Sequence, residues 1–184
     1  MDVQQFFLDL GLPPELVVFI VAAIPIVELR GAIPLAINVL EMPWYSAFTL
    51  AIAGNMLPVP FILLFLDWLT RTLGRYPTFE RFFSWLFTRT RSRSGVIEKY
   101  RNLGLALFVA VPLPMTGAWT GAIAAVILGI PFRDALLYIF IGVVMAGVIV
   151  TALSLMGWWG GLVAGIALAA LLIAGTLRRR NRQS

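Results

Sequence analysis

The sequence predicts an all-α integral membrane protein made of an inverted repeat, in which each half is a re-entrant helical hairpin followed by a transmembrane helix. Three observations support this fold class: the apolar composition, two similar segments interrupted by proline and glycine, and the distribution of the basic residues. Of the 184 residues, 60% are hydrophobic and only 12% are charged. Soluble domains carry about twice this charged fraction, so a lipid bilayer is the expected solvent.

The residue types that are missing exclude several kinds of chemistry. The chain has no cysteine and no histidine, which excludes disulfides, thiolate metal sites and imidazole catalysis. The remaining residues show no spacing typical of a nucleophile with its base and no cluster of metal ligands. We therefore expect neither an enzyme nor a metal or cofactor. Membrane topology accounts for the net charge of +5 better than binding to nucleic acid does.

The chain is expected to form a single membrane domain, because apolar regions long enough to enter or cross a bilayer follow one another along it. These regions are Leu16–Leu40, Ala47–Leu66, Leu103–Ile130, Ala135–Leu155 and Gly157–Leu177. The predicted parts are a first repeat over about 15–73, a linker over 74–101, a second repeat over about 102–156, a C-terminal transmembrane helix over 157–177 and a basic tail over 178–184.

The linker is polar but rich in aromatic residues. Phe79, Phe82, Phe83, Leu86 and Phe87 recur at helical spacing, and charged residues stand among and beside them, namely Arg75, Glu80, Arg81 and Arg89. This pattern predicts an amphipathic helix that lies in the membrane interface. A simple loop that carries aromatic residues is the alternative.

Two of the apolar regions contain clusters of proline and glycine. Proline removes a backbone donor and clashes with the preceding turn, so such clusters predict unwound backbone. Unwound backbone is tolerated at membrane depth only where protein or a water-filled cavity covers it. The clusters are Pro25, Gly31 and Pro34 in the first region and Pro112, Pro114, Gly117 and Gly121 in the third.

These prolines and glycines also indicate an internal repeat. At an offset of 87, Pro25 aligns with Pro112 and Pro34 with Gly121; at an offset of 88, Pro43 aligns with Pro131 and Gly54 with Gly142. One inserted residue reconciles the two offsets. Each unit is then a broken segment, a short turn marked by proline and a crossing helix.

The basic residues decide the topology. Two full spans need ~40 residues, and Leu16–Leu40 has 25, so each broken segment is either one kinked span or a re-entrant hairpin. Hairpins place thirteen of the fourteen basic residues on one face, whereas single spans separate the linker from the tail. The positive-inside rule favours hairpins. The linker and C-terminal tail are then cytoplasmic, the N-terminus lies outside and the repeats are inverted.

The fourteenth basic residue, Arg30, lies inside the first broken segment, two residues after Glu28. A charge at the centre of a membrane helix costs ~2.5–3.5 kcal/mol, so such residues normally face a cavity and find a partner. In a continuous helix the two side chains point apart, but at an unwound tip they can converge. Three roles stay open: binding of an anionic head group by Arg30, transfer of a coupling proton by Glu28, or a structural ion pair that fixes the tip.

The second broken segment offers neutral groups in the same place. Thr116 and Thr120 carry hydroxyls, Trp119 carries an indole donor and Gly117 permits a close approach to the backbone. Free amides at a helix start can help to hold an anion. Close helix packing is the alternative explanation of this segment. Asn55, which lies before two prolines in the second apolar region, either lines the same cavity or satisfies backbone that those prolines leave free.

Two motifs resemble a known family over most of the chain. They are Val-Glu28-Leu-Arg30-Gly-Ala-Ile-Pro34 and Val-Pro112-Leu-Pro114-Met-Thr-Gly117-Ala-Trp-Thr-Gly121. They resemble the prokaryotic family of small multidrug export proteins, which is itself distantly similar to the DedA/VTT membrane proteins. DedA/VTT proteins have paired re-entrant hairpins in inverted repeats, with acidic and arginine residues at the centre. This chain differs in its second hairpin, which has neither an acid nor an arginine.

The resemblance implies a transporter or lipid flippase of a prokaryotic cell membrane. Its substrate would be a lipid-linked phosphate of the undecaprenyl phosphate type or a phospholipid, which would move through a cavity between the two hairpins. Membrane lipids are the expected partners, with an anionic head group near Arg30, and a homodimer is one expected assembly. Two alternatives are a proton-coupled exporter of small molecules, with Glu28 binding the cation, and a membrane assembly factor that transports nothing.

Overall fold

The computed structural model describes residues 11–73, 95–111, 116–157, 159–160 and 165. This part of the chain is helical and contains no strand. Residues 74–94 of the predicted interfacial linker 74–101, most of the predicted C-terminal helix 157–177 and the basic tail lie outside the described residues. The principal elements are α2 (Pro14–Ala23), α3 (Glu28–Pro34), the π-helical turn η1 (Leu35–Val39), α4 (Trp44–Met56), α5 (Pro58–Leu73), α7 (Gly95–Ala110), α8 (Ala118–Ile127) and α9 (Phe132–Leu155).

Two stretches are long and apolar enough to cross a membrane. One is Trp44–Thr70, formed by α4 and most of α5, and the other is α9. A bilayer needs about 20 apolar residues per spanning helix, and these stretches have 27 and 24 residues. Both begin directly after a proline in extended conformation, Pro43 and Pro131. The length and composition of these helices fit the predicted membrane location.

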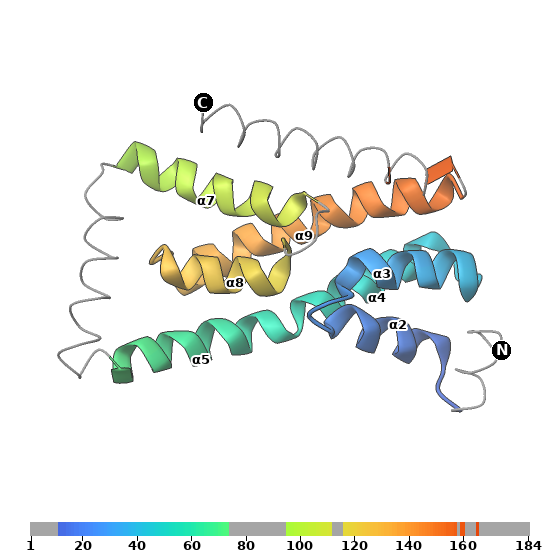
Figure 1. Cartoon of the computed structure of the whole chain (residues 1–184), viewed down its shortest axis with the longest axis horizontal. Helices are drawn as coiled ribbons and strands as arrows, with labels where there is room; N and C mark the ends of the chain where they lie inside the picture. The colour runs from blue at the N-terminus through green and yellow to red at the C-terminus, as the bar shows by residue number, and fades with distance from the viewer. Residues whose placement is uncertain (1–10, 74–94, 112–115, 158, 161–164, 166–184) are drawn as a thin grey trace, which may run out of the picture.

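α2 and α3 form a helical pair, which we call hairpin 1 (Figure 1). The turn between them exists because Pro25 cannot continue a helix and disfavours helical backbone at the residue before it. Ile24 accordingly has an extended conformation (φ −74°, ψ 131°). The N–H of Glu28 then donates to the carbonyl of Ile24 at 3.0 Å, which closes the turn.

The break in hairpin 1 is shorter than the sequence predicts. Gly31 and Pro34 do not interrupt the helix but lie inside α3, so Glu28 and Arg30 occupy its first turn rather than an unwound tip. Pro34 is the last residue of α3, and a wider turn follows it, in which the N–H of Leu40 donates to the carbonyl of Leu35. A π-type turn of this kind accommodates a proline without ending the helical path.

α7 and α8 form a second helical pair, hairpin 2. α7 begins at Gly95, so it includes residues 95–101 of the predicted linker. Pro112 and Pro114 lie outside the described residues. The chain re-enters a helix directly after Gly117, whose φ of +138° is a conformation that residues with a Cβ rarely adopt.

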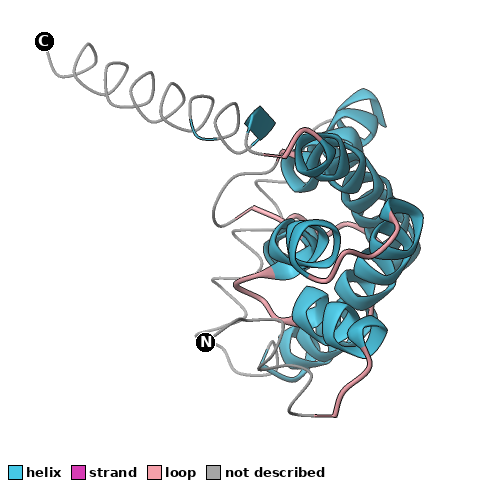
Figure 2. Ribbon diagram, turned by 90° about the vertical axis from the view of Figure 1, so that its right-hand side faces the viewer, coloured by secondary structure: helices cyan, strands magenta, loops and turns pink. Residues whose placement is uncertain are grey.

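The two hairpins each occupy one half of the molecule's length, and their inner ends meet near its middle (Figure 1). The helix pair α4–α5 and helix α9 run along the whole length beside them. α2 and α3 pack on α4, whereas α7 and α8 pack on α9; α3 also contacts α9, and α8 contacts α5. In the view turned by 90°, the helices pack side by side as a bundle (Figure 2).

Equivalent contacts recur in the two halves. A Cβ added at Gly54 would collide with the carbonyl oxygen of Phe19 in α2, and one added at Gly142 would collide with that of Ala106 in α7. Phe19 and Ala106 are separated by 87 residues and the two glycines by 88, which are the offsets of the sequence repeat. Only glycine permits this approach of two helix backbones, so the first helix of each hairpin packs on its long helix in the same way.

Candidate functional site

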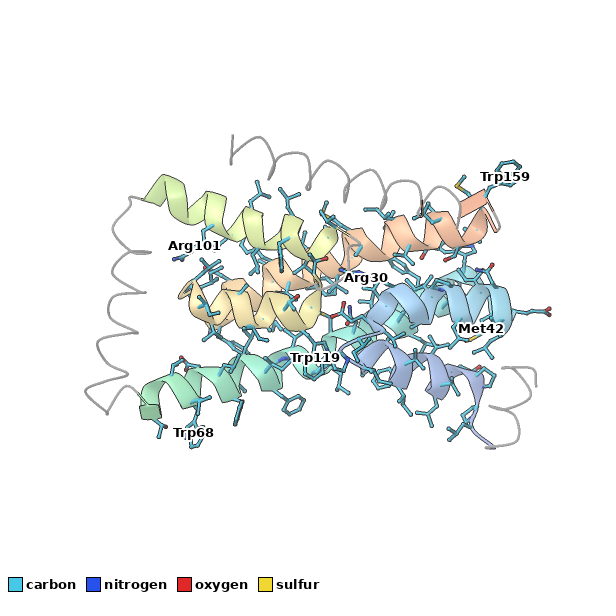
Figure 3. The ribbon with its side chains drawn as sticks, viewed as in Figure 1. Arg30, Met42, Trp68, Arg101, Trp119 and Trp159 are labelled. Atoms are coloured by element: carbon cyan, nitrogen blue, oxygen red, sulfur yellow. The ribbon has the colours of Figure 1, made fainter. Side chains whose placement is uncertain are left out.

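The charged pair of hairpin 1 lies at the middle of the molecule, where the inner ends of the two hairpins meet. Arg30 and Trp119 mark this place, coming from hairpin 1 and hairpin 2 respectively (Figure 3). Glu28 is only 5% exposed, and Arg30 is partly buried. The opposite charges of these two residues attract each other.

The carboxylate of Glu28 lies at the start of α8. Its Oε1 accepts a hydrogen bond from the backbone N–H of Trp119 at 3.5 Å, and its oxygens occupy the space that a Cβ on Gly117 would need. The first N–H groups of a helix carry partial positive charge. Gly117 therefore allows the carboxylate to reach the positive end of α8.

The guanidinium of Arg30 lies at the carboxyl-terminal end of α7. Its Nη2 donates to the carbonyl of Val111, directly after α7, at 3.2 Å and to the hydroxyl of Thr116 at 3.0 Å. The Thr116 hydroxyl in turn donates to the same Val111 carbonyl at 2.7 Å. A cation is thus held at the negative end of a helix, where it is electrostatically favoured.

Trp119 makes the reciprocal contact from hairpin 2. Its indole N–H donates to the carbonyl of Ala23, the last residue of α2, at 3.2 Å. The sequence predicted Thr120 as another substrate-binding residue beside Trp119. The Thr120 hydroxyl donates to the carbonyl of Gly117, at the start of the same helix, at 3.4 Å. The predicted hydroxyls were those of Thr116 and Thr120. Among the described hydrogen bonds, only that of the Thr116 hydroxyl reaches hairpin 1.

The structure brings part of the predicted set together, whereas Pro112 and Pro114 lie outside the described residues. It brings together Glu28, Arg30, Thr116, Gly117 and Trp119. Pro25 lies on the exposed turn of hairpin 1, and Gly31 and Pro34 serve as helical residues of α3.

Asn55 is fully buried, and neither its amide oxygen nor its amide nitrogen has a hydrogen-bond partner among the described residues. It therefore does not satisfy the backbone near the two prolines of α5, which was one of its two predicted roles. The described residues also contain no group of three or more acidic, histidine or cysteine side chains that could hold a metal ion.

Sequence patterns could not single out the backbone carbonyls of Ala23 and Val111, because every residue carries a carbonyl. The usable signal was the proline that follows each of them within two positions, Pro25 and Pro112. A helix that stops before a proline leaves its last carbonyls without helical donors, so a side chain from elsewhere is needed there.

A match to a known protein family helps to assign a function to this arrangement. A family model described as "Putative small multi-drug export protein" matches residues 28–149. This range begins at Glu28, includes all of hairpin 2 and extends into the last turns of α9, and it covers about two thirds of the chain. No curated protein and no solved structure matches the chain. The chain belongs to this family of small multi-drug export proteins.

Proposed function

We propose that the protein is a membrane transporter that moves an amphiphilic substrate with an anionic head group, a lipid-linked phosphate or phospholipid, along the seam between hairpin 1 and hairpin 2. The observation that carries this proposal is the meeting of Arg30 and Thr116 from opposite hairpins at the middle of the molecule. A guanidinium can bind a phosphate through two parallel hydrogen bonds, and a neighbouring hydroxyl adds another donor.

The arrangement of the helices supports a transport role. Two half-length hairpins whose inner ends meet, each packed on a full-length helix through equivalent glycine contacts, are what an inverted repeat of re-entrant hairpins would produce. Many secondary transporters bind their substrates where such broken segments meet. In this proposal the end of the molecule that carries Arg101 (Figure 3) and Arg133 is cytoplasmic, following the positive-inside rule.

The contacts at the site indicate how an anion would be accommodated. The head group would replace the Val111 carbonyl and the Thr116 hydroxyl as partners of Arg30. Glu28 carries a negative charge close by, so an arriving anion would meet repulsion from it. Uptake of a proton by Glu28 would keep the total charge of the site constant, which makes coupling of the substrate to a proton a natural part of the proposal.

Export of a lipophilic cation coupled to protons is the second candidate. The family's description and the buried carboxylate of Glu28 favour it. In that case Glu28 would bind the cation, and Arg30 would oppose binding by repulsion. The two candidates thus assign opposite roles to Arg30.

The test compares variants of the purified protein in liposomes, with transfer of a labelled phospholipid or polyprenyl phosphate as one measurement and efflux of a lipophilic cation as the other. Lipid transfer should be lost in Arg30→Ala and should not be restored in Arg30→Lys, which lacks the planar fork. Arg133→Gln, at an exposed position in the first turn of α9, is the control and should retain transfer.

Two results would contradict the first candidate. If the unaltered protein exports the cation but transfers no lipid, and Glu28→Gln abolishes that export, the protein is a cation exporter. If the unaltered protein moves neither lipids nor cations, a role in membrane assembly is the better explanation.

A further inference from the structure

The hydrogen bonds between the two hairpins form a crossed pair. Arg30 of hairpin 1 donates to the carbonyl of Val111, at the end of α7. Trp119 of hairpin 2 donates to the carbonyl of Ala23, at the end of α2. Each hairpin therefore supplies a side-chain N–H group to the carbonyl end of the other hairpin's first helix.

The two acceptors are nearly equivalent in the internal repeat, whereas the two donors are not. Ala23 and Val111 are 88 residues apart, within one residue of the offset of 87 that relates the first helices of the hairpins. Arg30, however, aligns with Gly117, and Trp119 aligns with an alanine of α3. The same contact is thus made twice by different side chains, which indicates that the contact itself is needed at this place.

Separation of the hairpins would break all of these contacts in one step. The last carbonyls of α2 and α7 have no donors within their own helices. Separation would take the indole donor of Trp119 from the Ala23 carbonyl, and it would leave the Val111 carbonyl, which belongs to an exposed residue, with the hydroxyl of Thr116. A carbonyl that loses a donor is costly away from water. The carboxylate of Glu28 would also leave the start of α8. These costs favour the arrangement in which the two hairpins touch. They arise together because each of these contacts joins hairpin 1 to hairpin 2.

We propose that Arg30 and Trp119 are the two latches of a single gate, which holds hairpin 1 against hairpin 2 and has to open before a substrate can pass between them. Trp119 is a positioning residue in this gate, since its indole N–H is engaged with Ala23. The gate goes beyond the proposed function because it does not depend on which substrate is carried, and it is tested without any substrate.

The natural absence of cysteine allows a single introduced thiol to report opening without background. Ala32→Cys in α3 and Ala118→Cys in α8 place reporters on both hairpins at positions that are 0% exposed. Trp119→Phe removes the indole donor and keeps an aromatic ring. It should speed labelling by a maleimide about fivefold at both reporters, which is the effect of losing one hydrogen bond of ordinary strength.

Trp68→Phe is the matched control, because Trp68 is 59% exposed and lies on α5 far from the inner ends of the hairpins (Figure 3). It should leave labelling unchanged at both reporters. A second latch variant, Arg30→Gln, should speed labelling at both reporters as well, and the double variant should show the product of the two single factors.

Two outcomes would overturn the gate. Faster labelling at Ala118→Cys alone would mean that the indole contact only steadies α8. Unchanged labelling at both reporters in Trp119→Phe, even with a lower Tm, would mean that the contact is packing without control over opening. Since no substrate is present, neither result depends on the outcome of the lipid-transfer assay.

Discussion

At the scale of single residues, Glu28 combines an unfavourable backbone with a favourable side-chain environment. Its φ of +51° lies in the left-handed region, which costs a residue with a Cβ roughly 1–2 kcal/mol. The carboxylate compensates by lying at the positive end of α8, beside Gly117 and within reach of the Trp119 N–H. Strained residues of this kind cluster at functional sites, where the surrounding contacts hold them in place.

Gly117→Ala should therefore destabilise the protein strongly. The new Cβ would occupy the place of the Glu28 carboxylate, and the φ of +138° is unfavourable for alanine. We expect the free energy of unfolding to fall by more than about 1 kcal/mol, measured as a lower Tm in detergent. Gly104→Ala in α7 is the control, because a Cβ there meets nothing within 4 Å; its Tm should be equal or slightly higher. Equal Tm values for both variants would contradict the close approach of Glu28.

Asn55→Leu should stabilise the protein, in contrast to most polar-to-apolar changes at functional positions. Both amide atoms of Asn55 are buried without a partner among the described residues, and such a group costs about 1–3 kcal/mol. Leucine has the same branched shape and the same number of side-chain heavy atoms as asparagine, and it has no polar group to leave unsatisfied. We expect a higher Tm together with reduced lipid transfer, because natural proteins often keep a destabilising group only where function needs it. A lower Tm would show that the amide is satisfied in the membrane.

Among the elements, three of the half-length helices, α2, α7 and α8, have an end that is bound by a group from another part of the chain. In hairpin 2 the outer end is closed as well as the inner one: Arg101 of α7 donates to the carbonyl of Leu128, which follows α8, at 3.0 Å. Helices of about ten residues are marginal by themselves, so α8 gains much of its stability from these contacts and from packing on α5 and α9.

Arg101→Gln should consequently loosen the outer end of α8 without affecting hairpin 1. Hydrogen–deuterium exchange followed by mass spectrometry should show faster exchange for residues 126–130 and unchanged exchange for α2 and α3. Hydrogen bonds to charged groups contribute about 1.5–3 kcal/mol, so exchange there should rise by about tenfold or more. Equal acceleration in both hairpins would indicate general unfolding and would contradict a local role for Arg101.

In the whole molecule, the two hairpins lie in opposite halves and their inner ends meet near the middle, with α4–α5 and α9 alongside (Figure 1). If the molecule is inserted as we propose, the turn before α4 and the turn before α9 face opposite sides of the membrane. Single cysteines at Glu41 and Phe132, both of which are exposed, should then be labelled by an impermeant maleimide from opposite sides of sealed vesicles. Labelling of both from one side would contradict the inverted arrangement of the repeats.

Several features of the fold could be predicted from the sequence because they follow from local chemistry. The long helices were predicted from uninterrupted apolar runs, and their starts from Pro43 and Pro131. The break in the first apolar region followed from Pro25, whose ring prevents a helix from continuing. The extent of that break could not be predicted, because Gly31 and Pro34 are helix breakers by propensity and were nevertheless accommodated in α3 and the turn that follows. Tertiary packing overrides propensity in such cases.

Residue types and their order are enough to identify Arg30 as an exceptional charge within an apolar region, with Glu28 two residues before it. The contacts of both residues could be known only from the folded protein: Arg30 reaches the carbonyl end of α7, and Glu28 reaches the amide end of α8. The reason is physical. The charge of a side chain is a property of its residue type, whereas the partial charge of a helix end arises only when the helix has formed and another helix has brought its end within reach.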